Sequence, residues 1–265
     1  MNRYLLIILL SFPVLAFHSC NKPDVSNEDE PETIIPCLPA TLSHDAIAFY
    51  SFSGGSLSDI TGRGSNLQNP TTATPAPDRN GNPACAFRFN GGDFLTGPNT
   101  SFLNSLPGFT VSLWYNPADS TRAGKDYEVL LSRDSSSNIG DRHGQWSVAL
   151  YDCRKAVFAR HSTAWDKHIS PMVGNTCQDE TNLRTGSWHH MAATWGSSGN
   201  LMSLYRDGVL QDTSSVSYYS SVQDKGALFV GRYYIGLIDD IIIFNRELTA
   251  GEVQQLAVLE TCCSK

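Results

Sequence analysis

The chain has 265 residues, of which 17% are charged, and it contains 21 glycines and 13 prolines. This composition is typical of one large domain built from strands and turns. The formal net charge is −7 and the sequence has no basic cluster. Because nucleic-acid binding requires a positive stripe on the protein surface, we expect no nucleic-acid partner.

The chain begins with an apolar segment, Tyr4–Phe17, which ends shortly before Cys20. The segment is too short for a comfortable membrane span and is interrupted by Pro13, so it predicts a signal peptide. A cysteine at this place resembles the lipobox of bacterial lipoproteins, which implies that residues 1–20 are a lipoprotein signal peptide and that Cys20 is lipidated. An ordinary secretory signal peptide with a chance cysteine is the alternative.

A polar segment follows Cys20. Five acidic residues and three prolines lie between residues 21 and 36, with almost no apolar side chain. Such a segment cannot bury enough apolar surface to offset the entropy of ordering, so we expect 21–40 to be a disordered linker and 41–265 to be the domain. Acidic residues behind a lipidated cysteine also resemble the signals that export some lipoproteins to the outer face of the outer membrane, which implies attachment by a lipid anchor only.

The first half of the domain contains short runs in which apolar and polar residues alternate, a pattern typical of strands. In the clearest run, Phe109, Val111 and Leu113 share one side. Two polar stretches, 53–82 and 161–183, are predicted as long loops. The predicted strands are 47–52, 84–90, 109–115, 128–132, 146–151 and 155–159.

The second half is predicted to continue as antiparallel strands and to end in a helix. Asp207-Gly208 between two alternating runs predicts a tight type I′ hairpin turn. Thr249 and Glu252 have the spacing of a capping box, which predicts a short C-terminal helix. The predicted strands are 188–195, 201–206, the return at 209–210, 226–230 and 236–244.

Three motifs resemble the laminin-G-like, concanavalin-type jelly-roll domains. They are W-H-H-M-A-A-T-W at 188–195 with L-Y-R-D-G-V-L at 204–210, G-L-I-D-D-I-I-I-F-N-R-E-L at 236–248, and A-F-Y-S-F at 48–52 with L-S-D-I-T-G-R-G at 57–64. The resemblance implies an all-β, antiparallel β-sandwich jelly roll of the concanavalin A-like lectin/glucanase type with a short C-terminal helix. It does not determine function, because this fold carries binding modules, enzymes and spacers alike.

Six cysteines remain after Cys20, and an even number in an exported chain suggests three disulfides. Metal binding is not favoured because the sequence has no Cys-x-x-Cys pair. In the resembled fold the terminal strands lie side by side, which implies that Cys37 pairs with Cys262 or Cys263 and that Cys85 takes the other. Cys153 and Cys177 bracket a loop-like segment and are predicted to pair with each other.

The resemblance also implies a structural calcium ion. Calcium takes six to eight oxygen ligands, and glycine-rich turns supply carbonyls. In the family the D-x-[ST]-G-x-G loop and an aspartate of the closing strand often share the ion. The implied ligands are Asp59, Asp239 or Asp240, and a carbonyl of Gly62 or Gly64. Arg63 departs from the family pattern, and its charge could replace the ion by pairing with Asp59. The alternative is that these aspartates only cap turns.

Catalysis is not predicted. Glycoside hydrolases of this fold use carboxylates alternating on one strand, and the sequence has no E-x-D-x-E run. Asp239 and Asp240 are adjacent, so we expect them to point to opposite faces. The same alternation argues that His189 and His190 cannot share one metal ion.

Aromatic side chains in or beside predicted loops are the remaining candidates, because sugars stack on aromatic rings. We select Trp165, Tyr219 and Tyr234 as ligand-binding residues, and expect paired tyrosines such as Tyr233 and Tyr234 to place one ring outward and one inward. The prediction is a non-catalytic binding module at the cell surface, with a carbohydrate as the leading ligand and an extracellular protein second. A structural spacer and a glycan-active hydrolase with a non-standard site are the alternatives.

Overall fold

A computed structural model describes residues 34–118, 127–134, 146–151, 154–161, 166–169, 186–215 and 226–263; for residues 161 and 166–169 it describes the backbone alone. Residues 33–265 form one compact unit. Several predictions fall outside the described residues. These are the signal peptide with Cys20, most of the linker, the Cys153–Cys177 pair, Trp165 and Tyr219.

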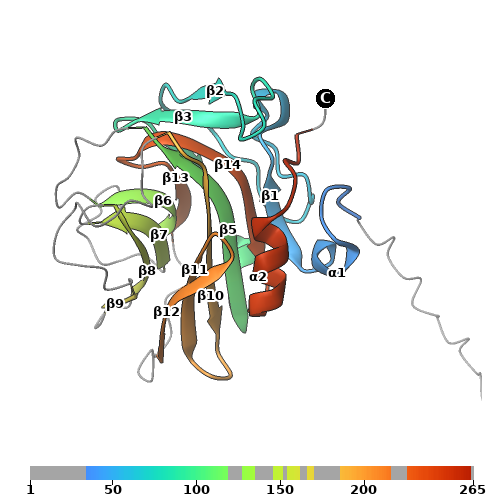
Figure 1. Ribbon diagram of the computed structural model, residues 1–265, viewed down its shortest axis with the longest axis vertical. Coiled ribbons are helices and arrows are strands. Elements are labelled where there is room, and N and C mark those ends of the chain that lie inside the picture. Colours follow the sequence, from blue (N-terminus) through green and yellow to red (C-terminus); the bar gives the residue numbers. More distant parts are fainter. Residues whose placement is uncertain are drawn as a thin grey trace, which may run out of the picture. The chain divides into compact units, whose positions relative to one another are not determined.

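Two antiparallel sheets make up the described part of the chain (Figure 1). The larger has eight strands in the order β12-β11-β10-β5-β14-β3-β2, with β1 also paired to β14. Its strands are β1 (Ala46–Tyr50), β2 (Thr74–Ala76), β3 (Ala86–Asn90), β5 (Gly108–Pro117), β10 (His189–Gly196), β11 (Leu201–Arg206), β12 (Val209–Ser215) and β14 (Ile235–Phe244).

The smaller sheet has six described strands in the order β4-β13-β6-β7-β8-β9. They are β4 (Leu95–Gly97), β6 (Glu128–Asp134), β7 (Trp146–Tyr151), β8 (Lys155–His161), β9 (Asp166–Ile169) and β13 (Ala227–Val230). The helical elements are α1 (Ala40–Ser43), α2 (Ala250–Ala257), and two 3₁₀ turns, η1 (Ser53–Gly55) and η2 (Ser101–Leu103). The predicted all-β sandwich with a short C-terminal helix is confirmed.

The main core lies between the two sheets, and the alternation of the strands explains it. Phe109, Val111, Leu113 and Tyr115 of β5 all belong to this core, as their shared side predicted. A second apolar cluster lies on the other face of the larger sheet, where Val253 and Leu256 of α2 are buried. Both faces of β14 are therefore covered, which explains its unbroken apolar run at 241–244.

The predicted turn and cap are both confirmed. Asp207 and Gly208 both have positive φ, 49° and 78°, as a type I′ turn requires. The side chain of Thr249 accepts a hydrogen bond from the backbone of Glu252, and the Glu252 carboxylate accepts one in return from the Thr249 backbone. The strands β2, β4 and β9 were not predicted, because three or four residues are too few to show alternation.

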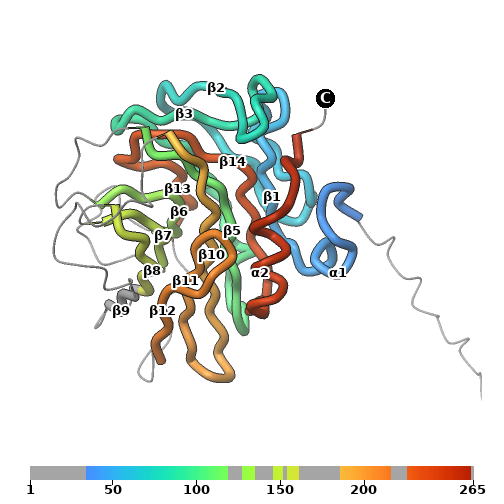
Figure 2. Tube along the Cα trace, viewed as in Figure 1, coloured from blue at the N-terminus to red at the C-terminus, as the bar shows by residue number. Residues whose placement is uncertain are grey.

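Two disulfides tie both ends of the domain together. Cys37 bonds to Cys262 and Cys85 to Cys263, with Cα–Cα distances of 5.3 and 5.7 Å. The predicted pairing is confirmed, and it follows from the antiparallel pairing of β1 with β14. Figure 2 shows the red C-terminal tail running from α2 past β1. Such disulfides are typical of exported proteins.

The domain begins earlier than predicted. Ile35 and Leu38 belong to the predicted linker, yet both are buried against the second apolar cluster. The Cys37–Cys262 disulfide and these two side chains hold the segment, so composition alone placed the boundary too late. In the described residues, no helix has the length and apolar character needed to cross a membrane.

Candidate functional site

Asp59, the first predicted calcium ligand, is engaged by hydrogen bonds from its own chain. Its Oδ1 accepts from the backbone N–H groups of Phe49 (2.8 Å) and Thr61 (3.1 Å). Its Oδ2 accepts from the Thr61 hydroxyl and the Gly64 N–H, both at 2.8 Å. Gly62 has φ +70°, which glycine allows at low cost. Asp59 therefore orders the turn and joins it to β1, the alternative considered for these aspartates.

Arg63 does not pair with Asp59, contrary to the expectation from the sequence. Its Nη1 instead donates to the carbonyls of Ser43, His44 and Ala46, at 3.1, 2.7 and 3.1 Å. The guanidinium thus satisfies the carbonyls between the end of α1 and the start of β1, where backbone acceptors lack helical partners.

Asp239 and Asp240 do not point to opposite faces, because β14 contains a β-bulge at this point. Asp239 pairs with Trp114 of β5 and Ile242 pairs with Ser112, so β14 has one extra residue in between. Asp240 takes the positive φ of 42°. The bulge lies where the other neighbour of β14 changes from β3 to β1. The prediction from simple alternation was wrong, since it assumed a regular strand.

One guanidinium lies against both carboxylates. Arg79 Nη1 is 2.6 Å from Asp239 Oδ2 and 2.9 Å from Asp240 Oδ2. The arginine stacks on Trp114, 4.5 Å from the ring centroid, and its Nη2 donates to the Leu259 carbonyl at 3.1 Å. Asp239 and Asp240 are only 1% and 2% exposed. A substrate could not reach them without rearrangement of the sheet.

Burial is the main influence on the protonation of this pair. It raises the pKa of Asp239 well above its usual value, with a further contribution from the Asp240 carboxylate. Burial also raises the pKa of Asp240 to about 6, and the Arg79 guanidinium acts in the opposite direction. One guanidinium facing two buried carboxylates leaves one negative charge uncompensated, which explains why the second ionisation is unfavourable.

The residues expected to hold calcium therefore do not fit a calcium shell. Their carboxylate oxygens belong to two separate networks, one around Asp59 and one around Arg79, and N–H donors already contact both oxygens of Asp59 and the Oδ2 atoms of Asp239 and Asp240. Calcium needs six to eight free oxygens converging on one point.

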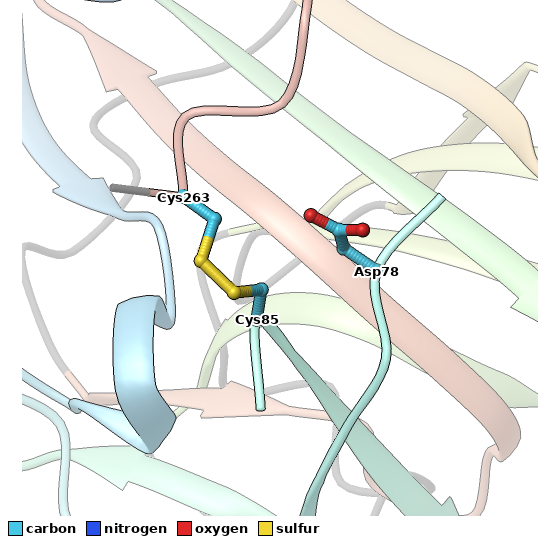
Figure 3. Close-up of side chains that lie close together, drawn as sticks. All are labelled: Asp78, Cys85 and Cys263. Carbon is cyan, nitrogen blue, oxygen red and sulfur yellow. A yellow bond between two sulfur atoms is a disulfide. The ribbon is translucent and has the colours of Figure 1, made fainter. Parts of the chain in front are cut away.

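Another metal-type cluster comprises Asp78, Cys85 and Cys263, whose ligand atoms lie within 4.8 Å of one another. Figure 3 shows the Asp78 carboxylate beside the bond that joins the two sulfurs. Disulfide sulfurs are not thiolates, which are the metal ligands. Asp78 also accepts three hydrogen bonds, from the N–H groups of Asn80 and Asn82 and from the Asn82 amide. This cluster is structural.

The adjacent histidines lie on opposite faces, as the sequence predicted. A hydrogen bond of 2.8 Å joins His190 Nε2 to Ser112 Oγ in a fully buried position, and burial lowers the pKa of His190 to about 3. His189 Nδ1 lies 3.0 Å from the Asp207 carboxylate. The His190 ring therefore joins β10 to β5, and the His189 ring joins β10 to the turn between β11 and β12.

Of the two tyrosines after β13, one faces outward and one inward, as expected. The outward residue is Tyr233, however, and not Tyr234, which the sequence analysis selected as a ligand-binding residue. Tyr234 is 0% exposed and lies in the main core, so its ring cannot stack on a ligand and its assignment is corrected. Tyr233 is 43% exposed and has the left-handed φ of 59°. Gly231 and Tyr233 make the connection to β14 a turn, and strand alternation does not apply there.

Arg232, the neighbour of Tyr233 in the chain, is buried and lies over two half-buried aromatic rings, Phe94 and Phe229. We call Phe94, Phe229, Arg232 and the exposed Tyr233 the β13 aromatic surface. Leu228 and Val230 face the core, so Phe229 faces outward. The rings of Phe94 and Phe229 are 5.8 Å apart. The Arg232 guanidinium lies 3.4 Å from the centroid of the Phe229 ring, which fixes that ring in place. The sequence signal for this surface is Phe229, an aromatic residue between the core residues Leu228 and Val230 of β13.

Comparison with known proteins defines the class. A family model described as the concanavalin A-like lectin/glucanases superfamily matches residues 89–254, more than half of the chain. The chain belongs to this family.

Similar proteins share parts of the sequence or the fold. Neuronal pentraxin-1 of Rattus norvegicus is 28% identical over 97 residues, which is 31% of this chain and 22% of that protein. The binding domain of Paraclostridial Mosquitocidal Protein 1 has a TM-score of 0.66 at 17% identity, and that of botulinum neurotoxin serotype D has 0.65 at 14%. Each structural match covers 82% of this chain and 52% of the other, so the chain spans about half of those domains.

Proposed function

We propose that this chain is a non-catalytic binding module that recognises carbohydrate at the cell surface through the β13 aromatic surface. The observation that carries this proposal is Tyr233, a large aromatic side chain held 43% exposed on a left-handed backbone, while its neighbour Tyr234 fills the core. Left-handed backbone is unfavourable for a non-glycine residue, and such positions cluster at binding sites.

The aromatic rings that contact Arg232, the neighbour of Tyr233 in the chain, suit a sugar ring. Phe94 and Phe229 present aromatic faces tilted by 59° to each other, and both are only partly buried. Rigid aromatic rings supply contact area with little loss of conformational entropy on binding. Arg232 stacks on Phe229 and lies 3.8 Å from Asp134, which holds the planar group and the ring beneath it in one arrangement.

The buried carboxylates favour binding over hydrolysis. Asp239 and Asp240 are paired with Arg79, and Glu128, which is 1% exposed, is paired with Arg154 at 2.9 Å. Glycoside hydrolysis requires two carboxylates that flank the scissile bond at about 5 to 10 Å from each other. These three carboxylates are closed off from a glycan chain.

Export and surface attachment complete the proposal. The two disulfides support an oxidising compartment. The predicted lipidation of Cys20 would attach the domain to the outer membrane, with the chain between Cys20 and the domain as a tether. Among proteins of similar fold, cell entry of botulinum neurotoxin type C depends on interaction with two ganglioside molecules. The binding domain of botulinum neurotoxin DC forms a complex with rat synaptotagmin II. The first supports a glycan as ligand, and the second keeps a protein ligand as the competing outcome.

A glycan array tests the proposal with residues 33–265, Tyr233→Ala and a matched control, Tyr151→Ala. Tyr151 is similarly exposed, at 40%, but lies on β7 outside the β13 aromatic surface. We expect wild type and Tyr151→Ala to bind the same glycans, and Tyr233→Ala to bind at least about tenfold more weakly, the loss typical of a central aromatic contact. A blank array for the wild type, or equal binding by Tyr233→Ala, would contradict the proposal.

A further inference from the structure

We infer that the chain supplies its own cations at the places where the family resemblance implied a metal ion: the guanidinium groups of Arg79 and Arg63 take the metal's structural role. The domain is then independent of divalent cations for its stability. This inference concerns folding and does not rest on the proposed carbohydrate function.

Arg79 occupies the position between the two aspartates of the bulge. Its side chain is 8% exposed, and a single nitrogen, Nη1, is in contact with both carboxylates at 2.6 and 2.9 Å. Two buried carboxylates side by side are strongly unfavourable unless a cation compensates them. Arginine is suited to this role because it stays charged in the protein interior and offers several donors in a fixed plane.

The same group also crosslinks two segments, as a bound metal would. Arg79 Nη2 donates to the Leu259 carbonyl at 3.1 Å, and Asp240 Oδ2 accepts from the Cys262 N–H at 3.1 Å. Further contacts between the two segments follow it in the C-terminal direction. They are Asn80 to Glu260, Asn82 to Thr261 and the Cys85–Cys263 disulfide. The C-terminal tail is therefore connected to residues 79–85 by a series of contacts that begins at Arg79 and ends at the Cys85–Cys263 disulfide.

Arg63 performs the second part of the role. A group of backbone carbonyls is a typical cation ligand set. Here the carbonyls of Ser43, His44 and Ala46 all accept from Arg63 Nη1, at 2.7 to 3.1 Å. The arginine joins the turn that Asp59 organises to the beginning of β1. It does so without using the Asp59 carboxylate, whose two oxygens already bind N–H and O–H donors.

Few carboxylate oxygens remain free for a metal ion at either place. In the Arg79 network, Asp240 Oδ1 is buried without a hydrogen-bond partner in the described structure, but the facing Oδ2 atoms both contact Arg79. One free carboxylate oxygen supplies little of the shell of six to eight oxygens that calcium requires. A metal ion could enter only by displacing the guanidinium.

Thermal unfolding of the full chain, in detergent, is the first test. We expect the same Tm in EDTA and in excess calcium chloride, to within about 1 °C, because a ligand that binds only the folded state would raise Tm by mass action. A lower Tm in EDTA, or a higher one with calcium, would overturn the inference. This measurement needs no variant and cannot be confused with failure to bind a glycan.

A charge-specific test follows with Arg79→Met, which keeps the length and apolar stem but removes the cation. We expect its Tm to fall by more than about 6 °C, the effect of leaving a buried ion pair half broken. Arg88→Met, on an exposed position of β3, is the matched control and should change Tm little. Adding Asp239→Asn and Asp240→Asn to Arg79→Met should restore most of the loss, because the uncompensated charges are gone.

Two results would contradict the role of Arg79. One is an Arg79→Met chain that unfolds at the wild-type temperature. The other is a triple variant no more stable than Arg79→Met, which would show that Arg79 acts by packing on Trp114 and not as a cation. If Arg79→Met fails to fold, Arg79→Lys retains a charge at the same place and should fold with a smaller loss; failure of that variant too would count against a purely electrostatic role.

Discussion

Removing either of the two disulfides that end at the adjacent Cys262 and Cys263 should destabilise the domain by nearly the same amount. The two bonds span 225 and 178 residues when each is considered alone. They are not independent, however. Once one bond is closed, the other closes only a loop of about 49 residues, made of the 48 steps from Cys37 to Cys85 and the one from Cys262 to Cys263.

The loop lengths give the magnitude. In the chain-entropy model a loop of about 49 residues is worth about 4 kcal/mol, and a loop of roughly 200 residues about 5 kcal/mol. Removing one bond should therefore cost about 4 kcal/mol whichever bond is removed. Removing both should cost about 9 kcal/mol, slightly more than twice the single loss, because the last bond to open closes the longer loop.

Chemical denaturation of three alanine variants measures these losses: Cys37→Ala with Cys262→Ala, Cys85→Ala with Cys263→Ala, and all four together. Replacing cysteines in pairs leaves no free thiol of either bond. In thermal unfolding of the same variants, removal of one disulfide should lower Tm by about 8 to 16 °C, at about 2 to 4 °C per kcal/mol for a domain of this size. A loss that differs more than twofold between the two bonds would refute the loop argument and show that local contacts, such as those of the buried Cys85, dominate.

Two further predictions concern the protonation of the bulge and a close approach in the core. The pKa of Asp240 is raised from 3.8 to about 6, so between about pH 4 and pH 6 the folded state keeps a proton that the unfolded state has lost. The contribution of Asp240 to the free energy of unfolding is therefore complete below about pH 4 and is lost as the pH rises through about 6. Urea denaturation from pH 4.5 to 7.5 should show that Asp240→Asn gains stability relative to wild type as pH rises; a pH-independent difference would contradict the raised pKa. Gly231 and Gly81 both have positive φ, but a Cβ at Gly231 would overlap the Phe89 ring, whereas one at Gly81 meets nothing within 4 Å. Gly231→Ala should therefore cost about 2 to 4 kcal/mol and Gly81→Ala about 1 kcal/mol, and equal losses would show that backbone strain alone decides both.

The sequence by itself determined the features that depend on neighbours along the chain. Alternation placed Phe109, Val111 and Leu113 on the core side of β5, because every regular strand turns successive side chains to opposite faces. Asp207-Gly208 specified its own turn, since only residues that tolerate positive φ adopt it. The capping box of α2 likewise lies within four residues.

The family resemblance extended this to one long-range feature. The cysteine pairing followed from the expectation that the terminal strands are neighbours, and the β1–β14 pairing is the reason it holds. The same resemblance gave a calcium ligand set that the structure does not support. The motifs lie at the expected positions of the fold. The partners of their aspartates, however, come from distant parts of the chain: Arg79, which contacts Asp239, lies 160 residues from it in the sequence.

Only the tertiary structure decided the candidate sites. The bulge that turns Asp239 and Asp240 towards one arginine forms where β14 passes from β3 to β1, and no local pattern records a change of neighbour. Tyr233 faces outward and Tyr234 inward in the turn between β13 and β14, where Gly231 lies directly against Phe89 of β3. Local patterns fix which face a residue would occupy in a regular element, while irregular positions are fixed by contacts between distant parts of the chain, and there the site residues lie.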